Sequence, residues 1–78
     1  MEKGTLVIFK KEAYTKGIYA YVAPFSGKNH LFVDEIGNTI KVPMEYVLRQ
    51  PTQEELLAEY MTMWQTSVND CLEEYGLA

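Results

Sequence analysis

The charge and the residue pattern of this 78-residue chain change abruptly at Pro51. Residues 1–50 alternate short apolar runs with Gly, Asn and Lys, contain all seven basic residues and carry a formal charge of +2. Residues 51–78 contain six acids and no Lys or Arg, so they carry −6 and bring the total to −4. The change predicts a single domain, residues 1–78, in two parts: a β-rich part over residues 1–50 and an acidic C-terminal helix over residues 51–78 that packs on it.

Size and composition limit the class of protein. A chain of this length buries only about 60% of its unfolded surface, so its core is thin. The single cysteine, Cys71, cannot form an internal disulfide, and a lone thiol is typical of a reducing compartment. No apolar run approaches the roughly 18 residues of a membrane span, and the N-terminus lacks the apolar stretch of a signal peptide. We therefore expect a cytoplasmic protein that does not enter a membrane.

Five short segments of the β-rich part are rich in β-branched and aromatic residues, which favour strands. They are residues 5–10, 18–22, 30–34, 39–42 and 47–49. In the second segment Ile18, Ala20 and Val22 alternate with Tyr19 and Tyr21, which predicts that the two sets lie on opposite faces. The pair Gly37-Asn38 predicts a tight hairpin, and residues 43–46 predict a short 3₁₀ turn before the last strand.

The order of these segments resembles the SH3-like small β-barrel. The resemblance covers residues 4–49 and rests on Gly4-Thr-Leu-Val-Ile-Phe, Gly17-Ile-Tyr-Ala-Tyr-Val, Leu31-Phe-Val-Asp, Gly37-Asn and Val42-Pro-Met-Glu-Tyr-Val. It implies an α+β protein in which a five-stranded barrel, or bent antiparallel sheet, precedes one long C-terminal amphipathic helix. Barrels of this kind serve many unrelated functions, so the resemblance alone assigns none.

The start of the C-terminal helix has the sharpest local signal. Thr52 and Glu55, directly after Pro51, have the spacing of a capping box, in which each side chain accepts a hydrogen bond from the other residue's amide. Gly76 suits the position just past a helix C-terminus. These signals predict one helix over residues 53–75, roughly 35 Å long.

The helix carries an apolar seam with spacings of 4, 3, 4, 3 and 4, formed by Leu57, Met61, Trp64, Val68, Cys71 and Tyr75. Leu56, Tyr60 and Met63 widen it in the first half only. We expect the first half to pack on the β part and the last turns to project, because a narrow seam suits one opposing helix. Glu73 and Glu74 stand at the negative end of the helix dipole with no cation nearby in the sequence, which favours a basic partner. The predicted protein-binding residues are Val68, Asp70, Glu73, Glu74 and Tyr75.

No pattern indicates catalysis, a metal or a cofactor. His30 is the only histidine and no cysteine lies near it, whereas a metal site needs three or four ligands. Cys71 occupies an apolar seam position and no activating base can be assigned to it. Adjacent carboxylates such as Glu73 and Glu74 point apart on a helix, so we interpret them as a solvated face.

Two functional hypotheses remain. The first is a non-enzymatic protein-interaction module; small acidic proteins of viruses, phages and mobile elements that inhibit or modulate a host protein share this size and charge. A homodimer joined through the C-terminal helix is compatible with it. The second is a nucleic-acid-binding module of the KOW type, in which bases stack on rings and lysines meet phosphates. Its candidate residues are Lys10, Lys11, Tyr19, Tyr21, Lys28 and Lys41.

Overall fold

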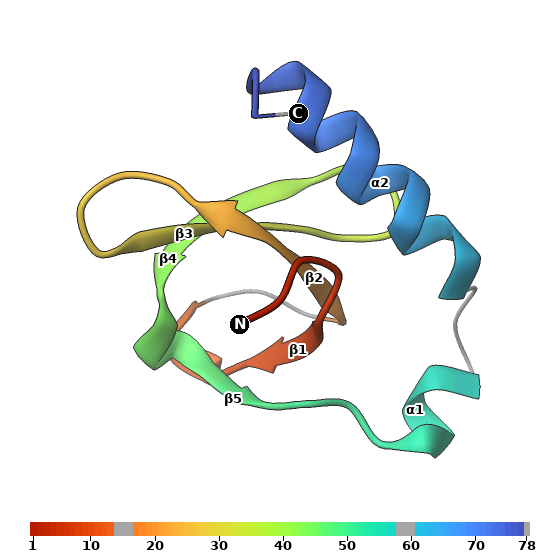
Figure 1. The fold of residues 1–78 in the computed structure, drawn as a ribbon. Helices are drawn as coiled ribbons and strands as arrows, with labels where there is room; N and C mark the ends of the chain where they lie inside the picture. The colour runs from red at the N-terminus through yellow and green to blue at the C-terminus, as the bar shows by residue number, and fades with distance from the viewer. Residues whose placement is uncertain (14–16, 58–60, 78) are drawn as a thin grey trace.

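The computed structural model describes the chain except residues 14–16, 58–60 and 78, and shows a mixed α+β fold (Figure 1). Five antiparallel strands form its sheet: β1 (Leu6–Phe9), β2 (Tyr19–Pro24), β3 (Asn29–Val33), β4 (Thr39–Pro43) and β5 (Val47–Arg49). Each lies within one or two residues of a segment predicted from β-branched and aromatic composition. The strand prediction is therefore confirmed.

The strands are ordered β4-β3-β2-β1-β5, so the first strand lies between the second and the last. The register shifts between Ile8 and Phe9 in β1 and between Tyr21 and Ala23 in β2. Such irregularities bend a strand and increase its twist. In the described part of the chain β4 and β5 end the sheet and do not pair with each other, so the sheet is open and the closed form of the predicted barrel is not shown.

The connections follow local side-chain chemistry. Single 3₁₀ turns form at η1 (Lys11–Ala13) and, as predicted, at η2 (Met44–Tyr46) just before β5. The β3–β4 turn is longer than the tight hairpin expected from Gly37-Asn38, because Val33 pairs with Thr39 across five intervening residues. The Asp34 carboxylate sets this length: it accepts hydrogen bonds from the backbone amides of Ile36 and Asn38 at 3.1 and 2.8 Å.

The C-terminal segment contains two helices where one was predicted. They are α1 (Gln53–Leu57) and α2 (Met61–Glu74), which run in different directions in Figure 1. Residues 58–60 lie outside the described part of the chain. The expectation of one 35 Å helix is therefore wrong, and the α2 that packs on the sheet has 14 residues.

Both predicted helix ends are confirmed. The Thr52 amide donates to Glu55 Oε1 at 2.8 Å, and the Glu55 amide donates to Thr52 Oγ1 at 3.2 Å, which completes the capping box. At the other end, Gly76 adopts a φ of 68°. The Leu77 amide then donates to the Leu72 carbonyl at 2.8 Å, which is the Schellman arrangement.

The core consists of two clusters on opposite faces of β2. Ile18, Ala20 and Val22 belong to the cluster that α2 covers, and Tyr19 and Tyr21 belong to the other, as the alternation predicted. The second cluster is aromatic: the Phe9 ring lies edge-on to Phe32 at 4.8 Å and to Tyr19 at 5.4 Å between centroids. Both faces of β2 are therefore buried, one beneath α2 and the other beneath the aromatic cluster.

Candidate functional site

The inward face of α2 belongs to the core. Trp64, Val68, Cys71 and Leu72 are all buried against β2 and β3, and the Trp64 indole N–H donates to the Ile18 carbonyl at 3.2 Å. Ser67 adds a hydrogen bond to the Glu35 carbonyl at 3.0 Å, which fastens α2 to the β3–β4 turn. These contacts hold the helix in one orientation on the sheet.

This packing corrects the expectation that the last turns of the helix project. Val68 is 4% exposed and lies within the core cluster, so its main role is to support the fold. The buried face of the helix is wider here than the seam predicted, because Leu72, which the seam did not include, packs beside Cys71. Tyr60 lies outside the described residues, as do the side chains of Leu57, Met61 and Met63.

Tyr75 is half-buried just past the end of α2, in a surface cluster of side chains from three separate segments of the chain. Its ring lies edge-on to Phe25 at 5.6 Å between centroids, and the Lys41 ammonium lies 4.9 Å from the Phe25 centroid and 5.1 Å from that of Tyr75. Lys41 therefore supplies the cation that the sequence did not reveal near the negative end of the helix. A lysine on β4 reaches this place only through the tertiary fold.

The outward face of α2 carries Asp70, Glu73 and Glu74, which we call the outer acids. All three are exposed, whereas their neighbours Cys71 and Leu72 are buried. Within residues 61–74 no Lys or Arg is present, so the helix itself offers no cation to compensate them. The fold thus presents three carboxylates on a helix whose opposite face is fixed to the sheet.

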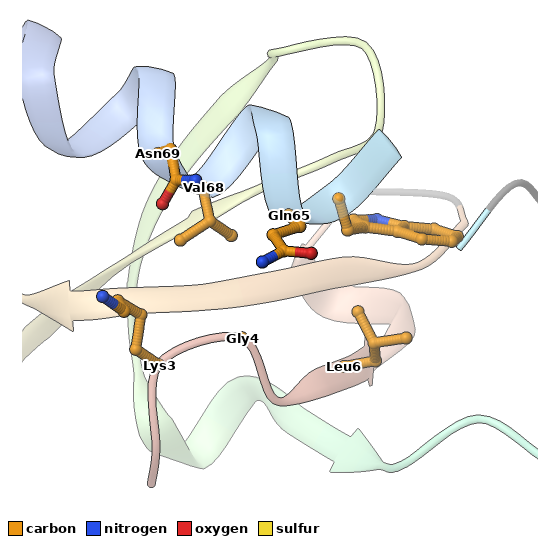
Figure 2. Close-up of a pocket in the computed structure, with 7 residues that line it drawn as sticks. Lys3, Gly4, Leu6, Gln65, Val68 and Asn69 are labelled. Atoms are coloured by element: carbon orange, nitrogen blue, oxygen red, sulfur yellow. The ribbon is translucent and has the colours of Figure 1, made fainter. Parts of the chain in front are cut away.

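A groove runs between α2 and the N-terminal segment and has a volume of about 380 Å³ (Figure 2). We call it the first groove. One wall consists of Lys3, Gly4 and Leu6, and the other of Trp64, Gln65, Val68 and Asn69. Figure 2 shows Leu6 at one end, Lys3 directed towards the helix at the other, and Gln65 between them. One end is therefore apolar and the other polar and cationic.

A second groove, the acidic groove, follows the other side of α2 and has a volume of about 330 Å³. Its charged lining residues are Glu35, Asp70 and Glu74, and no Lys or Arg lines it. Ile36, which is 74% exposed, stands at its rim on the β3–β4 turn. The two sides of the same helix thus differ in charge.

The residues predicted for nucleic-acid binding do not form one platform. Lys10, Lys11 and Lys28 are exposed, but Tyr19 and Tyr21 are buried in the aromatic core cluster, and burial raises the pKa of both phenols. A base can stack only on an accessible ring face. Lys41 lies over Phe25 and Tyr75, on the opposite side of the sheet from that cluster.

His30 and Cys71, the two residues most often used in catalysis, both pack against the core clusters. His30 Nδ1 lies 2.8 Å from the Tyr21 hydroxyl, at the end of the aromatic cluster. Burial raises the pKa of the Cys71 thiol, Glu74 raises it further and Lys41 opposes the change, so the reactive thiolate is disfavoured. Among the described residues, no three His, Cys, Asp or Glu side chains are placed to hold a metal ion.

No known protein family, curated protein or solved structure matches the chain. In the part of the chain that the structure describes, every helix is too short or too polar to cross a bilayer. The site is therefore built from the geometry alone. Sequence reasoning missed the first groove, whose only signal was the recurrence of amides at Gln65 and Asn69, one helical turn apart beside Trp64 and Val68.

Proposed function

We propose that this chain is a non-enzymatic protein-interaction module that binds a basic surface of another protein through the outer acids, Asp70, Glu73 and Glu74. The observation that carries the proposal is the division of α2 into two faces. Its inward face is committed to the core, while its outward face holds three exposed carboxylates without a Lys or Arg on the helix. Carboxylates at the C-terminal end of a helix oppose its dipole, so they weaken the helix locally and favour a cationic partner.

The scaffold proposed for this module is an SH3-like barrel. The strand order and the 3₁₀ turn before β5 support the resemblance. Small size and a net charge of −4 are also properties of viral, phage or mobile-element proteins that inhibit or modulate host factors, and we propose this class for the chain. A basic host protein is then the expected partner, in the cytoplasm, with no cofactor.

Nucleic-acid binding by a KOW-like surface ranks second. Exposed Lys10, Lys11 and Lys28 support it, but the burial of Tyr19 and Tyr21 removes the rings on which bases would stack. A heparin column separates the two hypotheses, because a nucleic-acid binder stays bound at moderate salt. We expect the protein to elute at low salt; retention at moderate salt would favour the second hypothesis.

The proposal is tested with a neutral-face variant, Asp70→Asn/Glu73→Gln/Glu74→Gln. The matched control is Glu2→Gln/Glu12→Gln/Glu45→Gln, which changes the net charge equally at three exposed acids that are not part of α2. Each protein is immobilised and exposed to an extract of the source cells, and retained proteins are quantified by mass spectrometry. We expect a basic protein that the parent and the control retain and the neutral-face variant loses, with retention falling as salt is raised. Equal retention by all three would contradict the proposal.

A homodimer through α2 would place the outer acids of two copies opposite each other without cations between them. Like charges opposed in this way disfavour association. We therefore expect the isolated protein to sediment as a monomer over a wide concentration range. A tight dimer in sedimentation equilibrium would overturn the preference for a foreign partner.

A further inference from the structure

The first groove differs in charge from the other exposed surfaces of α2. Its lining residues include the cation Lys3 and the amides Gln65 and Asn69 but no acid, whereas the acidic groove on the other side of the helix has three acids and no base. No described residue forms an ion pair with Lys3, and the two side-chain amides form no hydrogen bond with a described residue. These groups are donors available to an anion.

The arrangement of these donors indicates an amphipathic anion. The apolar end of the first groove is at Leu6, Lys3 and Asn69 lie at the other end, and Gln65 lies between the two ends (Figure 2). A volume of about 380 Å³ is at the small end of the roughly 300–1,000 Å³ typical of ligand sites. The ligand is therefore short, with an apolar side chain close to a negative group.

The surroundings of the groove favour a chain end over an internal acidic segment. A neighbouring depression shares Lys3 and Asn69 with the first groove and continues along α2. Glu73 lines that continuation, so further negative charge would be repelled beyond Lys3. A C-terminal residue meets this geometry, because its carboxylate is attached to the same Cα as its side chain and nothing follows it.

We propose that the first groove binds the C-terminus of a partner polypeptide, with its last apolar side chain against Leu6 at the apolar end and its terminal carboxylate beside Lys3, Gln65 and Asn69. This inference goes beyond the proposed function, because it uses another surface of α2 and the opposite charge. Either can fail without the other. Capture of a chain terminus by a few donors beside an apolar pocket is a recurring mode of peptide recognition.

The test uses the full chain and three synthetic peptides. The first is acetyl-Ser-Gly-Ser-Val-Leu with a free carboxylate, the second is its C-terminal amide, and the third is acetyl-Ser-Leu-Asp-Ser-Gly-amide, which has an internal acid. Trp64 is the only tryptophan and lines the groove, so its fluorescence reports occupancy. We expect the free carboxylate to bind about fivefold more tightly than the amide, the ratio that corresponds to roughly 1 kcal/mol for an exposed ion pair.

Two variants, each with a matched control, test whether the preference for the free carboxylate arises in the first groove. Lys3→Gln should remove most of it, whereas Lys28→Gln, which neutralises an exposed lysine outside both grooves, should leave it unchanged. Gln65→Glu should weaken binding of the free-carboxylate peptide, whereas Gln53→Glu on α1 should leave its binding unchanged. Equal binding of acid and amide, or equally tight binding of the internal-Asp peptide, would overturn the terminal-carboxylate assignment. No response to any peptide at millimolar concentration would overturn the site itself.

Discussion

The two helices of the C-terminal segment differ in how deeply their attachments to the rest of the fold are buried. At α1, Arg49 donates to both carboxylate oxygens of Glu55, at 2.7 and 3.2 Å, and Glu55 completes the capping box with Thr52. These groups are exposed or only half-buried. At α2 the attachment is Trp64, Val68, Cys71 and Leu72, all buried. Exposed ion pairs contribute little to stability, whereas buried apolar side chains contribute most of it. On α1 the partly buried Leu56 packs against the same core cluster. We infer that α2 is held by buried side chains, and α1 by Leu56 together with its local polar contacts.

The largest expected effect is at Trp64. Trp64→Ala removes a buried ring and its hydrogen bond to Ile18, so it should lower the free energy of unfolding by about 3–5 kcal/mol. Chemical denaturation followed by circular dichroism measures the loss. Trp64→Phe is the control that keeps most of the packing. A Trp64→Ala protein of near-normal stability would show that α2 is not anchored through this residue.

A smaller loss of stability is expected at Val68. Together with a substitution at Asn69, it compares a buried and an exposed position of α2. Val68→Ala should cost about 2 kcal/mol, because two buried methyl groups are removed and a cavity remains. Asn69→Ala, at the adjacent exposed position, should change the free energy of unfolding by less than about 0.5 kcal/mol. The same denaturation assay compares them. Equal costs at the two positions would contradict the inward orientation of Val68.

At α1 the corresponding change is Thr52→Ala. It leaves the Glu55 amide without its side-chain acceptor and should cost about 1 kcal/mol. Thr52→Ser keeps the hydroxyl and serves as the control. If both variants unfold at the parent's denaturant midpoint, the capping box of α1 contributes nothing to global stability. The difference between α1 and α2 in their contribution to the free energy of unfolding would then be larger than expected.

The stability of α1 should depend on pH through the ionisation of Glu55. Hydrogen bonds from the Arg49 guanidinium, and then from the Thr52 amide, lower the pKa of this carboxyl from 4.5 to about 2. Because the folded-state pKa lies below the unfolded one, the contribution of Glu55 is present above pH 4.5 and is lost as the pH falls towards 2. A nuclear magnetic resonance titration of the Glu55 carboxyl measures this pKa directly. A midpoint near 4.5 would mean that Arg49 and Glu55 are not paired in solution.

The features that could be predicted from the sequence are those whose cause is local. Alternation in residues 18–22, the Thr52/Glu55 spacing and Gly76 each act within a few residues, and the structure confirms all three. The contacts that define the candidate site connect distant segments. Lys41 lies over Tyr75, and Lys3 faces α2 across the first groove, because of the tertiary fold.

The wrong expectations have two origins, one in the tertiary fold and one in a local signal that was overlooked. A continuous apolar seam cannot reveal that the helix is divided, nor that Leu72 completes the packing of α2. The hairpin prediction relied on Gly37-Asn38 and overlooked Asp34, whose carboxylate binds two amides and lengthens the turn. Asx turns of this kind are local, so an aspartate four residues before the asparagine was a signal that sequence reasoning could have used.

If the outward face of α2 serves a partner, it is not required for folding. The most direct measurement is the denaturation midpoint of the neutral-face variant, Asp70→Asn/Glu73→Gln/Glu74→Gln, beside that of the parent at the same salt concentration. We expect an equal or higher midpoint, because the variant removes three like charges from the C-terminal half of a helix whose dipole already disfavours them. A lower midpoint would show that the outer acids stabilise the fold, and would contradict their assignment to a partner.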